Sequence, residues 1–312
     1  MVIHPPDQPS LLEPGGDNAV AYAVGITADE WTLLIMRQAL SGRPQRYGEL
    51  RERLPISDAM LAARLRMLTG YGLLRAEEYT TAPRRYEYVV TQRGAGLWPV
   101  LIGIWAWERR WVPGQAEHLP LMRHAACGEI ADPRLHCGTC GAPANLDDVC
   151  GRFGPSWSWR RSVPKVPTRR RGAASGSGDF AATLALIGNR WAVSLIGAIM
   201  LGTHRFGELR KLTGAPAPVV SQRLRTFTES GALAAGPDGG YFLTEQGRDF
   251  FGVIACCLRW GAQWFVSPEG PALTLIHRDD HEFAASLHCD QCDQALAGAD
   301  IRELSPAAVG SR

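Results

Sequence analysis

The sequence predicts a mainly α-helical chain with small β-hairpins, an α+β class, made of two winged helix-turn-helix modules that are each followed by a small β-rich Cys/His segment. Three observations predict this class. Residues 46–72, RYGELRERLPISDAMLAARLRMLTGYG, recur as residues 204–231, HRFGELRKLTGAPAPVVSQRLRTFTESG, with the shared positions at one offset. Each copy has the pattern of a short helix, a turn and a second helix, followed by two strand-like runs and a Trp-rich helix. A CxxC motif follows each Trp-rich helix.

Length and composition fit two globular domains. The chain has 312 residues, of which 46% are apolar and 21% charged. Its formal net charge is only +2, so a nucleic-acid surface must come from local clusters of arginine. No apolar run reaches the ~20 residues that cross a bilayer, and residues 1–18 do not resemble a secretory signal. We therefore expect a cytoplasmic, nucleoid-associated protein with no membrane partner, whose eight cysteines are metal ligands or buried thiols.

Composition and the repeat together predict the division of the chain. The expected parts are a disordered N-terminus (1–18), a first winged helix-turn-helix domain (19–112), a first Cys/His segment (113–150), a basic flexible linker (151–179), a second winged helix-turn-helix domain (180–266), and a second Cys/His segment with a C-terminal tail (267–312). The linker is rich in Pro, Gly and Ser. It also carries cations, so it is either a solvated tether or a basic arm along DNA; among them are Arg160, Arg161, Lys165, Arg169, Arg170 and Arg171.

The helices of the first module follow from caps and apolar spacing. Thr27 is predicted to cap the first helix, and a second helix is expected over residues 47–54. Ser57 is predicted to cap a third helix over residues 58–69, the candidate recognition helix. Its apolar residues recur at spacings of three and four, so they should face the core and leave the arginines outside.

A wing and a terminal helix complete this module. Residues 73–79 and 86–90 are rich in aromatic and β-branched residues, which predicts two paired strands with Arg84 and Arg85 near the tip. Thr91 should cap a last helix through residue 112. The second module repeats the order, but its wing is shorter, rich in Gly and free of Arg and Lys.

The candidate DNA-binding residues lie on the two recognition helices and the first wing. They are Ser57, Arg64, Arg66, Arg84 and Arg85 in the first module, and Ser221, Gln222, Arg223 and Arg225 in the second. Where the second module offers Ser221 and Gln222, the first has two alanines, so base reading should be uneven. A competing interpretation is that Arg64 and Arg223 form ion pairs with Glu49 and Glu208 of their own modules.

The same residues carry a family resemblance. The segments EWTLLIMRQALSG, RYGELRERL, RLRMLTGYGLL, RRYEYVVTQRG and WERRW resemble HxlR-type transcription regulators, which are relatives of the MarR group. This resemblance implies double-stranded DNA as the partner and a pair of modules on successive major grooves. The pair would be an intrachain pseudo-dimer or a homodimer of whole chains, on a pseudo-palindromic or asymmetric operator.

Each Cys/His segment supplies four candidate metal ligands. The first has His124, Cys127, Cys137 and Cys140, and the second has His277, His281, Cys289 and Cys292. Two ligands before a turn and a CxxC after it suit tetrahedral zinc, so we expect one structural Zn²⁺ in each segment. His136 and His288 are spare candidates. A redox-active CxxC or metal-free buried thiols are the alternatives.

The surplus of tryptophan allows two interpretations. Five indoles, Trp98, Trp105, Trp107, Trp260 and Trp264, either line a pocket for a small apolar or aromatic ligand or fill the interface between modules. Two rival functions come from other classes: a protein-interaction module that has lost DNA binding, and a metalloenzyme or thiol oxidoreductase. The sequence contains no general base paired with a nucleophile and no phosphate-binding loop, so we expect no enzyme.

Overall fold

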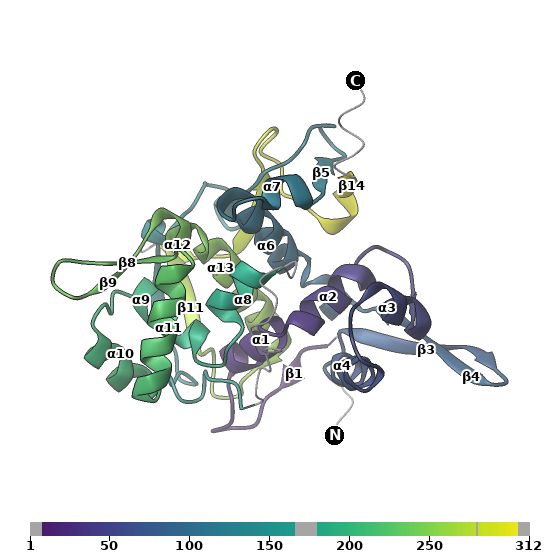
Figure 1. The fold of residues 1–312 in the computed structure, drawn as a ribbon, viewed down its shortest axis with the longest axis horizontal. Helices are drawn as coiled ribbons and strands as arrows, with labels where there is room; N and C mark the ends of the chain where they lie inside the picture. The colour runs from purple at the N-terminus through teal and green to yellow at the C-terminus, as the bar shows by residue number, and fades with distance from the viewer. Residues whose placement is uncertain (1–7, 166–179, 279, 305–312) are drawn as a thin grey trace.

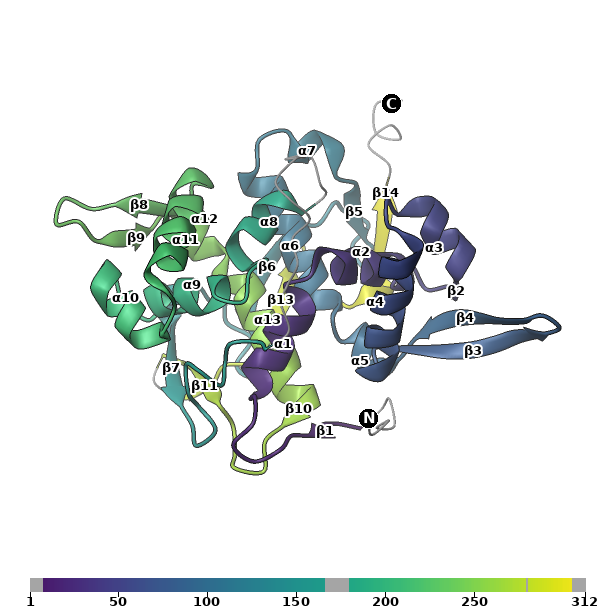
Figure 2. The same cartoon turned by 60° about the horizontal axis from the view of Figure 1, so that its bottom comes forward.

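The computed structural model describes residues 8–165, 180–278 and 280–304 (Figure 1). Its two modules occupy opposite halves of the molecule, and their wings point away from each other in both views (Figures 1 and 2). The linker residues Arg169, Arg170 and Arg171 lie outside the described residues. Within the described ranges no single helix is long and apolar enough to cross a membrane, although two sharply bent helix pairs pass that test together.

Both modules have the predicted order of helix, helix-turn-helix, hairpin and helix. The first contains α1 (Ala19–Thr27), α2 (Glu30–Ala39), β2 (Gln45–Arg46), α3 (Tyr47–Arg53), α4 (Asp58–Gly70), β3 (Leu74–Thr81), β4 (Arg84–Val90), α5 (Gln92–Ala95) and α6 (Trp98–Trp111). The second contains α8 (Ala181–Ile187), α9 (Ala192–Met200), α10 (Phe206–Thr213), α11 (Ala217–Glu229), β8 (Leu233–Ala235), β9 (Tyr241–Leu243), α12 (Glu245–Asp249) and α13 (Phe251–Trp264). The strands of each wing pair in antiparallel fashion.

The remaining elements surround the two Cys/His segments. They are β1 (Ser10–Leu11), α7 (Gln115–His118), β5 (Leu121–His124), β6 (Pro133–Cys137), the 3₁₀ turn η1 (Leu146–Asp148), β7 (Val149–Phe153), β10 (Phe265–Val266), β11 (Leu273–His277), β12 (His281–Glu282), β13 (Ala285–Cys289), the 3₁₀ turn η2 (Gly298–Asp300) and β14 (Ile301–Leu304). Strands of the first segment pair with strands of the second: β5 with β14, β6 with β13, and β7 with β11. The segments are therefore interleaved and do not form two separate units.

Three local predictions need correction. Asp29, whose carboxylate accepts from the Thr32 N–H at 2.9 Å, caps α2, whereas Thr27 ends the preceding helix α1. Thr91 caps only the short α5, because the chain bends before α6 begins. The first part of the expected linker is ordered, since β7 pairs with β11 and Trp157 stacks on Phe153 at 4.5 Å.

An approximate two-fold axis relates the two halves. The Trp107 indole N–H donates to the Gln246 carbonyl of the other module at 3.0 Å, and the Trp260 N–H donates to the Arg93 carbonyl at 3.0 Å. Both pairs of equivalent residues, 107 with 260 and 93 with 246, are separated by 153 positions in the sequence. The indoles of Trp107 and Trp260 are only 2% exposed, so they fill the interface between the modules.

One equivalent position in the two terminal helices differs between the halves. On α13, Gly261 lets α1 approach so closely that an added Cβ would lie 2.6 Å from the Ala23 Cβ and 2.9 Å from the Ala19 carbonyl oxygen. On α6, 153 positions earlier in the sequence, stands Glu108, which is fully buried. Its carboxylate accepts from the backbone N–H and the hydroxyl of Thr183, in the first turn of α8, at 2.8 and 2.6 Å.

We expect Gly261→Ala to lower the free energy of unfolding by about 1–2 kcal/mol, because overpacking at the α1–α13 crossing outweighs the gain in helix propensity. The matched control is Gly197→Ala in α9, where an added Cβ meets nothing within 4 Å. That change should raise stability by about 0.5–1 kcal/mol. Urea titrations followed by tryptophan fluorescence measure both. Equal midpoints for the two variants would show that α1 is not seated against Gly261.

Candidate nucleic-acid interface and candidate metal centres

Helix α4 is the candidate recognition helix of the first module. Ser57 caps it by accepting from the Met60 N–H at 3.4 Å, as predicted. Leu61, Leu65 and Leu68 are buried in the module core and fix the rotation of the helix. Arg66 is exposed, and it forms no ion pair with another described residue.

The predicted outward position of Arg64 is wrong. Its guanidinium lies 2.7 Å from the Asp29 carboxylate, and the two side chains are only 15% and 4% exposed. Because Asp29 also caps α2, this ion pair joins the recognition helix to the helix beneath it. The partner is therefore Asp29 and not Glu49, and the pair orients α4 from inside the module.

Helix α11 has the same design in the second module. Val220, Leu224 and Phe227 form its buried face. The predicted outward position of Arg223 is also wrong, since this residue is only 8% exposed and lies with the buried face of α11. The exposed side chains of α11 include Ser221, Gln222 and Arg225, the polar set that the sequence singled out. The preceding helix α10 adds two exposed cations that sequence reasoning missed, Arg210 and Lys211.

The wings differ in size and charge. Arg84 and Arg85 are exposed on the first wing, and the Arg84 guanidinium lies 4.0 Å from the Glu78 carboxylate. On the second wing, three-residue strands flank an acidic tip where Asp238 lies 3.3 Å from Arg205. The first wing thus offers a phosphate two exposed cations with Glu78 close to one of them, whereas the tip of the second wing offers Asp238 paired with Arg205.

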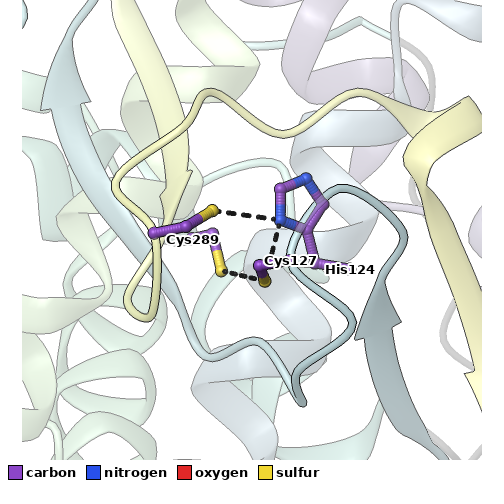
Figure 3. A group of neighbouring side chains, drawn as sticks. His124, Cys127 and Cys289 are labelled. Carbon is purple, nitrogen blue, oxygen red and sulfur yellow. Dashed lines mark hydrogen bonds between the residues drawn. The ribbon is translucent and has the colours of Figure 1, made fainter.

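Four metal-ligand side chains converge in a group that we call centre 1. They are His124 and Cys127 from the first segment with Cys289 and Cys292 from the second. Figure 3 labels the first three of them. The His124 Nδ1 atom lies 3.5 Å from the Cys127 Sγ and 3.4 Å from the Cys292 Sγ. The Cys127 and Cys289 sulfurs are 3.9 Å apart.

Centre 2 is the reciprocal group, formed by Cys137 and Cys140 with His277 and His281. The Cys137 Sγ lies 3.3 Å from the His281 Nε2, and the Cys140 Sγ lies 3.4 Å from the His277 Nδ1. The two imidazole nitrogens are 3.3 Å apart. All eight predicted ligands are thus used, four in each centre.

The predicted grouping of these ligands is wrong, because each centre draws two ligands from each segment. Strand pairing is the reason. β6 and β13 run antiparallel with Leu135 opposite Leu287, the equivalent residue of the other segment. Each strand ends in the first Cys of its CxxC, so the pairing carries each CxxC across the axis to the histidine of the other segment.

The donor geometry fits a tetrahedral ion. With Zn–S near 2.3 Å and Zn–N near 2.0–2.1 Å, tetrahedral angles place ligand atoms about 3.3–3.8 Å apart. The measured separations between ligand atoms in the two centres, from 3.3 to 3.9 Å, lie within this range or just above it. Burial raises the pKa of the Cys137 thiol, but N–H groups of Cys140 and Thr139 outweigh burial and lower that pKa to about 6, which favours the ligating thiolate. Asp280 is the main cause that raises the pKa of His281 to about 9.

The spare histidines lie on the two-fold axis. His136 and His288 stack with ring centroids 4.1 Å apart and an interplanar angle of 4°. Each Nδ1 faces a backbone carbonyl of its own turn, that of Gly141 at 3.0 Å and that of Asp293 at 2.7 Å. With Asp293 they form a third group of potential ligands, but parallel rings do not aim both lone pairs at one point between them.

Of the two interpretations of the surplus tryptophans, the structure favours filling of the interface between the modules over a ligand pocket. Trp105, Trp107, Trp260 and Trp264 are at most 8% exposed and belong to the main hydrophobic core. The apolar cavity found instead lies beneath Trp157 and Trp159 and measures about 80 Å³. This volume is about half that of a cavity that holds benzene, roughly 150 Å³. The arrangement thus favours packing as the role of the core tryptophans.

Comparison with known proteins places this geometry in a family. The HxlR-like helix-turn-helix profile matches residues 26–116 and 186–269. The HTH-type transcriptional regulator Rv3095 of Mycobacterium tuberculosis is 36% identical over 140 residues, 45% of this chain and 87% of that relative. YvaP of Bacillus subtilis, also named an HTH-type transcriptional regulator, is 35% identical over 29% of this chain and 83% of its own length. The solved structure of PA1374 from Pseudomonas aeruginosa aligns with 45% of this chain and 94% of its own, at 30% identity and a TM-score of 0.35. The two matched regions cover both modules, and the chain therefore belongs to the HxlR-like helix-turn-helix family, a family of DNA-binding transcription regulators.

Proposed function

We propose that one chain of this DNA-binding regulator presents two half-site readers, α4 and α11, to a single duplex. The observation that supports this most is that the two modules share one core across reciprocal contacts, such as the Trp107–Gln246 and Trp260–Arg93 hydrogen bonds. A shared core holds two recognition helices at one spacing, as the subunits of a dimeric helix-turn-helix protein do. The chain would thus do alone what a homodimer of single modules does.

Within this proposal the exposed polar groups divide by task. Gln222 and Arg225 on α11 suit hydrogen bonding to base edges, since amide and guanidinium groups match the major-groove donor and acceptor pattern. Arg66, Arg84 and Arg85 suit phosphate contacts by the first module. Because the halves differ, we propose an asymmetric operator with stronger sequence preference on the side of α11.

We expect the double substitution Gln222→Ala, Arg225→Ala to weaken binding to the cognate site about tenfold to a hundredfold, because one good base contact discriminates by ~1–3 kcal/mol. Removal of the cation should also lower the slope of log K against log salt by about one. Fluorescence anisotropy with DNA from upstream of its own gene, at two salt concentrations, measures both effects. Arg302→Ala is the matched control, since Arg302 is exposed on β14.

Three outcomes would overturn the proposal. Equal affinities for the double variant and the Arg302→Ala control would remove α11 from the interface. Absence of binding by the parent chain even at low salt would favour a protein-interaction module, an alternative that the acidic tip of the second wing keeps open. A DNA complex containing two chains would instead favour a homodimer with four modules.

We also propose that centres 1 and 2 hold structural Zn²⁺. Thiolate and imidazole donors in tetrahedral array favour zinc over hard cations such as Mg²⁺ or Ca²⁺. Four protein ligands at each centre leave no coordination position for a reacting water. The ions would therefore stabilise the fold without catalysing a reaction.

A further inference from the structure

We infer that metal bound at centres 1 and 2 clasps the two modules together, and that metal occupancy thereby decides whether α4 and α11 act on DNA as one unit. The first half of this inference concerns the fold alone. The second half rests on the proposed reading of two half-sites by one chain. Its structural basis is that each centre takes two ligands from the segment that follows the first module and two from the segment that follows the second.

The ligands close contacts between remote parts of the chain. In centre 1, Cys127 meets Cys289, 162 residues later, and in centre 2, Cys140 meets His277, 137 residues later. An ion bound to both members of such a pair cross-links the two modules. Because two such links flank the β6–β13 pair, they fix relative rotation as well as separation.

Both centres are coupled to the terminal helices of the modules. The segment that leads to His124 is tied to α6, since the Trp105 indole donates to the Pro120 carbonyl at 2.9 Å and the Arg109 guanidinium donates to the Leu119 carbonyl at 2.9 Å. On the other side, Arg259 of α13 donates to the Ala285 carbonyl of β13. Displacement of the segments would therefore act directly on α6 and α13, the helices that carry the module interface.

Without an ion, the segments would be held together by short strand pairs, by side chains such as Met122, Phe283 and Leu287 that pack on the main core, and by ion pairs. The exchanged strands are only four or five residues long, and β5–β14 is an isolated two-stranded sheet. Such short ladders are marginal in water without packing or a metal. The remaining contacts include surface ion pairs such as Arg278 with Asp148, which contribute little. Bound metal should therefore add strongly to the contacts that keep the segments interleaved.

The composite ligand sets can be tested by cobalt substitution of the full-length chain. The intensity of thiolate-to-Co²⁺ charge transfer grows with the number of thiolates, which is three in centre 1 and two in centre 2. The variant Cys289→Ser, Cys292→Ser should lose centre 1 and keep a centre with two thiolates. The matched variant Cys137→Ser, Cys140→Ser should keep a centre with three. Binding of two Co²⁺ ions per parent chain is expected.

The opposite assignment of these spectra would overturn the inference. If each segment held its own ion, Cys289→Ser, Cys292→Ser would keep three thiolates and Cys137→Ser, Cys140→Ser would keep two. Retention of one Co²⁺ per chain serves as the folding control for both variants. Should either variant fail to bind any metal, the single changes Cys289→Ala and Cys137→Ala answer the same question, since Cys289→Ala should leave the two-thiolate spectrum and Cys137→Ala the three-thiolate one.

The coupling to DNA is tested with two DNA fragments, one carrying both half-sites and one carrying a single half-site. Removal of metal should lower the affinity for the two-site fragment about tenfold or more, because the gain from two rigidly linked modules that bind one duplex would be lost. The affinity for the single-site fragment should change little. Addition of Zn²⁺ should restore the preference. If metal removal affects neither fragment, the clasp does not govern DNA binding. If the metal-loaded chain binds neither DNA fragment, the proposed function fails. The cobalt spectra still show whether each ion is shared between the two segments.

Discussion

Removal of metal from the parent chain is expected to lower its free energy of unfolding by about 4 kcal/mol per centre when free Zn²⁺ had been a thousandfold above the dissociation constant. The reason is linkage: an ion that binds four ligands in the folded chain has no preformed site in the unfolded chain. Both centres need residues from both segments, so each ion should stabilise the folded arrangement of the whole chain. Urea titration with and without a strong chelator measures the difference.

Cysteine variants separate this effect from general chelator effects. The chelator should shift Cys150→Ser as much as the parent, since Cys150 lies outside both centres. It should shift Cys137→Ser, Cys140→Ser by about half as much, because one centre remains. If the chelator does not change the unfolding midpoint of the parent chain, the eight side chains act as thiols and imidazoles without a structural ion.

The elements of the fold could be predicted because their signals are local. Ser57 stands immediately before the apolar periodicity of α4, and its hydroxyl meets the helix within three residues. The wing strands carry their own β-branched and aromatic residues. Where two local signals compete, sequence reasoning was wrong: Thr27 and Asp29 are both good caps, and only the packing of α1 against α13 shows that Thr27 ends a helix.

The metal ligands could be identified but their grouping could not. Spacing along the chain is the same whether His124 meets its own CxxC or the distant one at residue 289. Only the antiparallel pairing of β6 with β13 decides, and this contact joins strands some 150 residues apart in sequence. The position of Arg64 could not be predicted for a similar reason. Helical periodicity places Arg64 at the border between the buried and exposed faces of α4, and its partner Asp29 lies 35 residues away in the sequence.

Glu108 is the second site where we expect a large effect, because it is a fully buried carboxylate at the module interface. Glu108→Ala should lower the free energy of unfolding by about 2–3 kcal/mol, since the N–H and hydroxyl of Thr183 would lose a charged acceptor in a buried place. The Glu108 side chain also takes up an N–H in the first turn of α8, where the helix itself provides no acceptor. Urea titration of the metal-loaded chain measures the change.

Two controls decide whether the carboxylate or its volume matters. Glu108→Gln keeps an acceptor oxygen of the same shape and should cost about 1 kcal/mol less than the alanine change, while the exposed Glu117→Ala should be nearly neutral. The equivalent position on α13 is Gly261, where α1 approaches too closely for any side chain, so the two module contacts are stabilised differently: one by close backbone packing and one by a buried charged cap. If Glu108→Gln were as damaging as Glu108→Ala, the charge itself would hold α8 in place. If both were neutral, the module interface would depend on its tryptophans and the metal clasp alone.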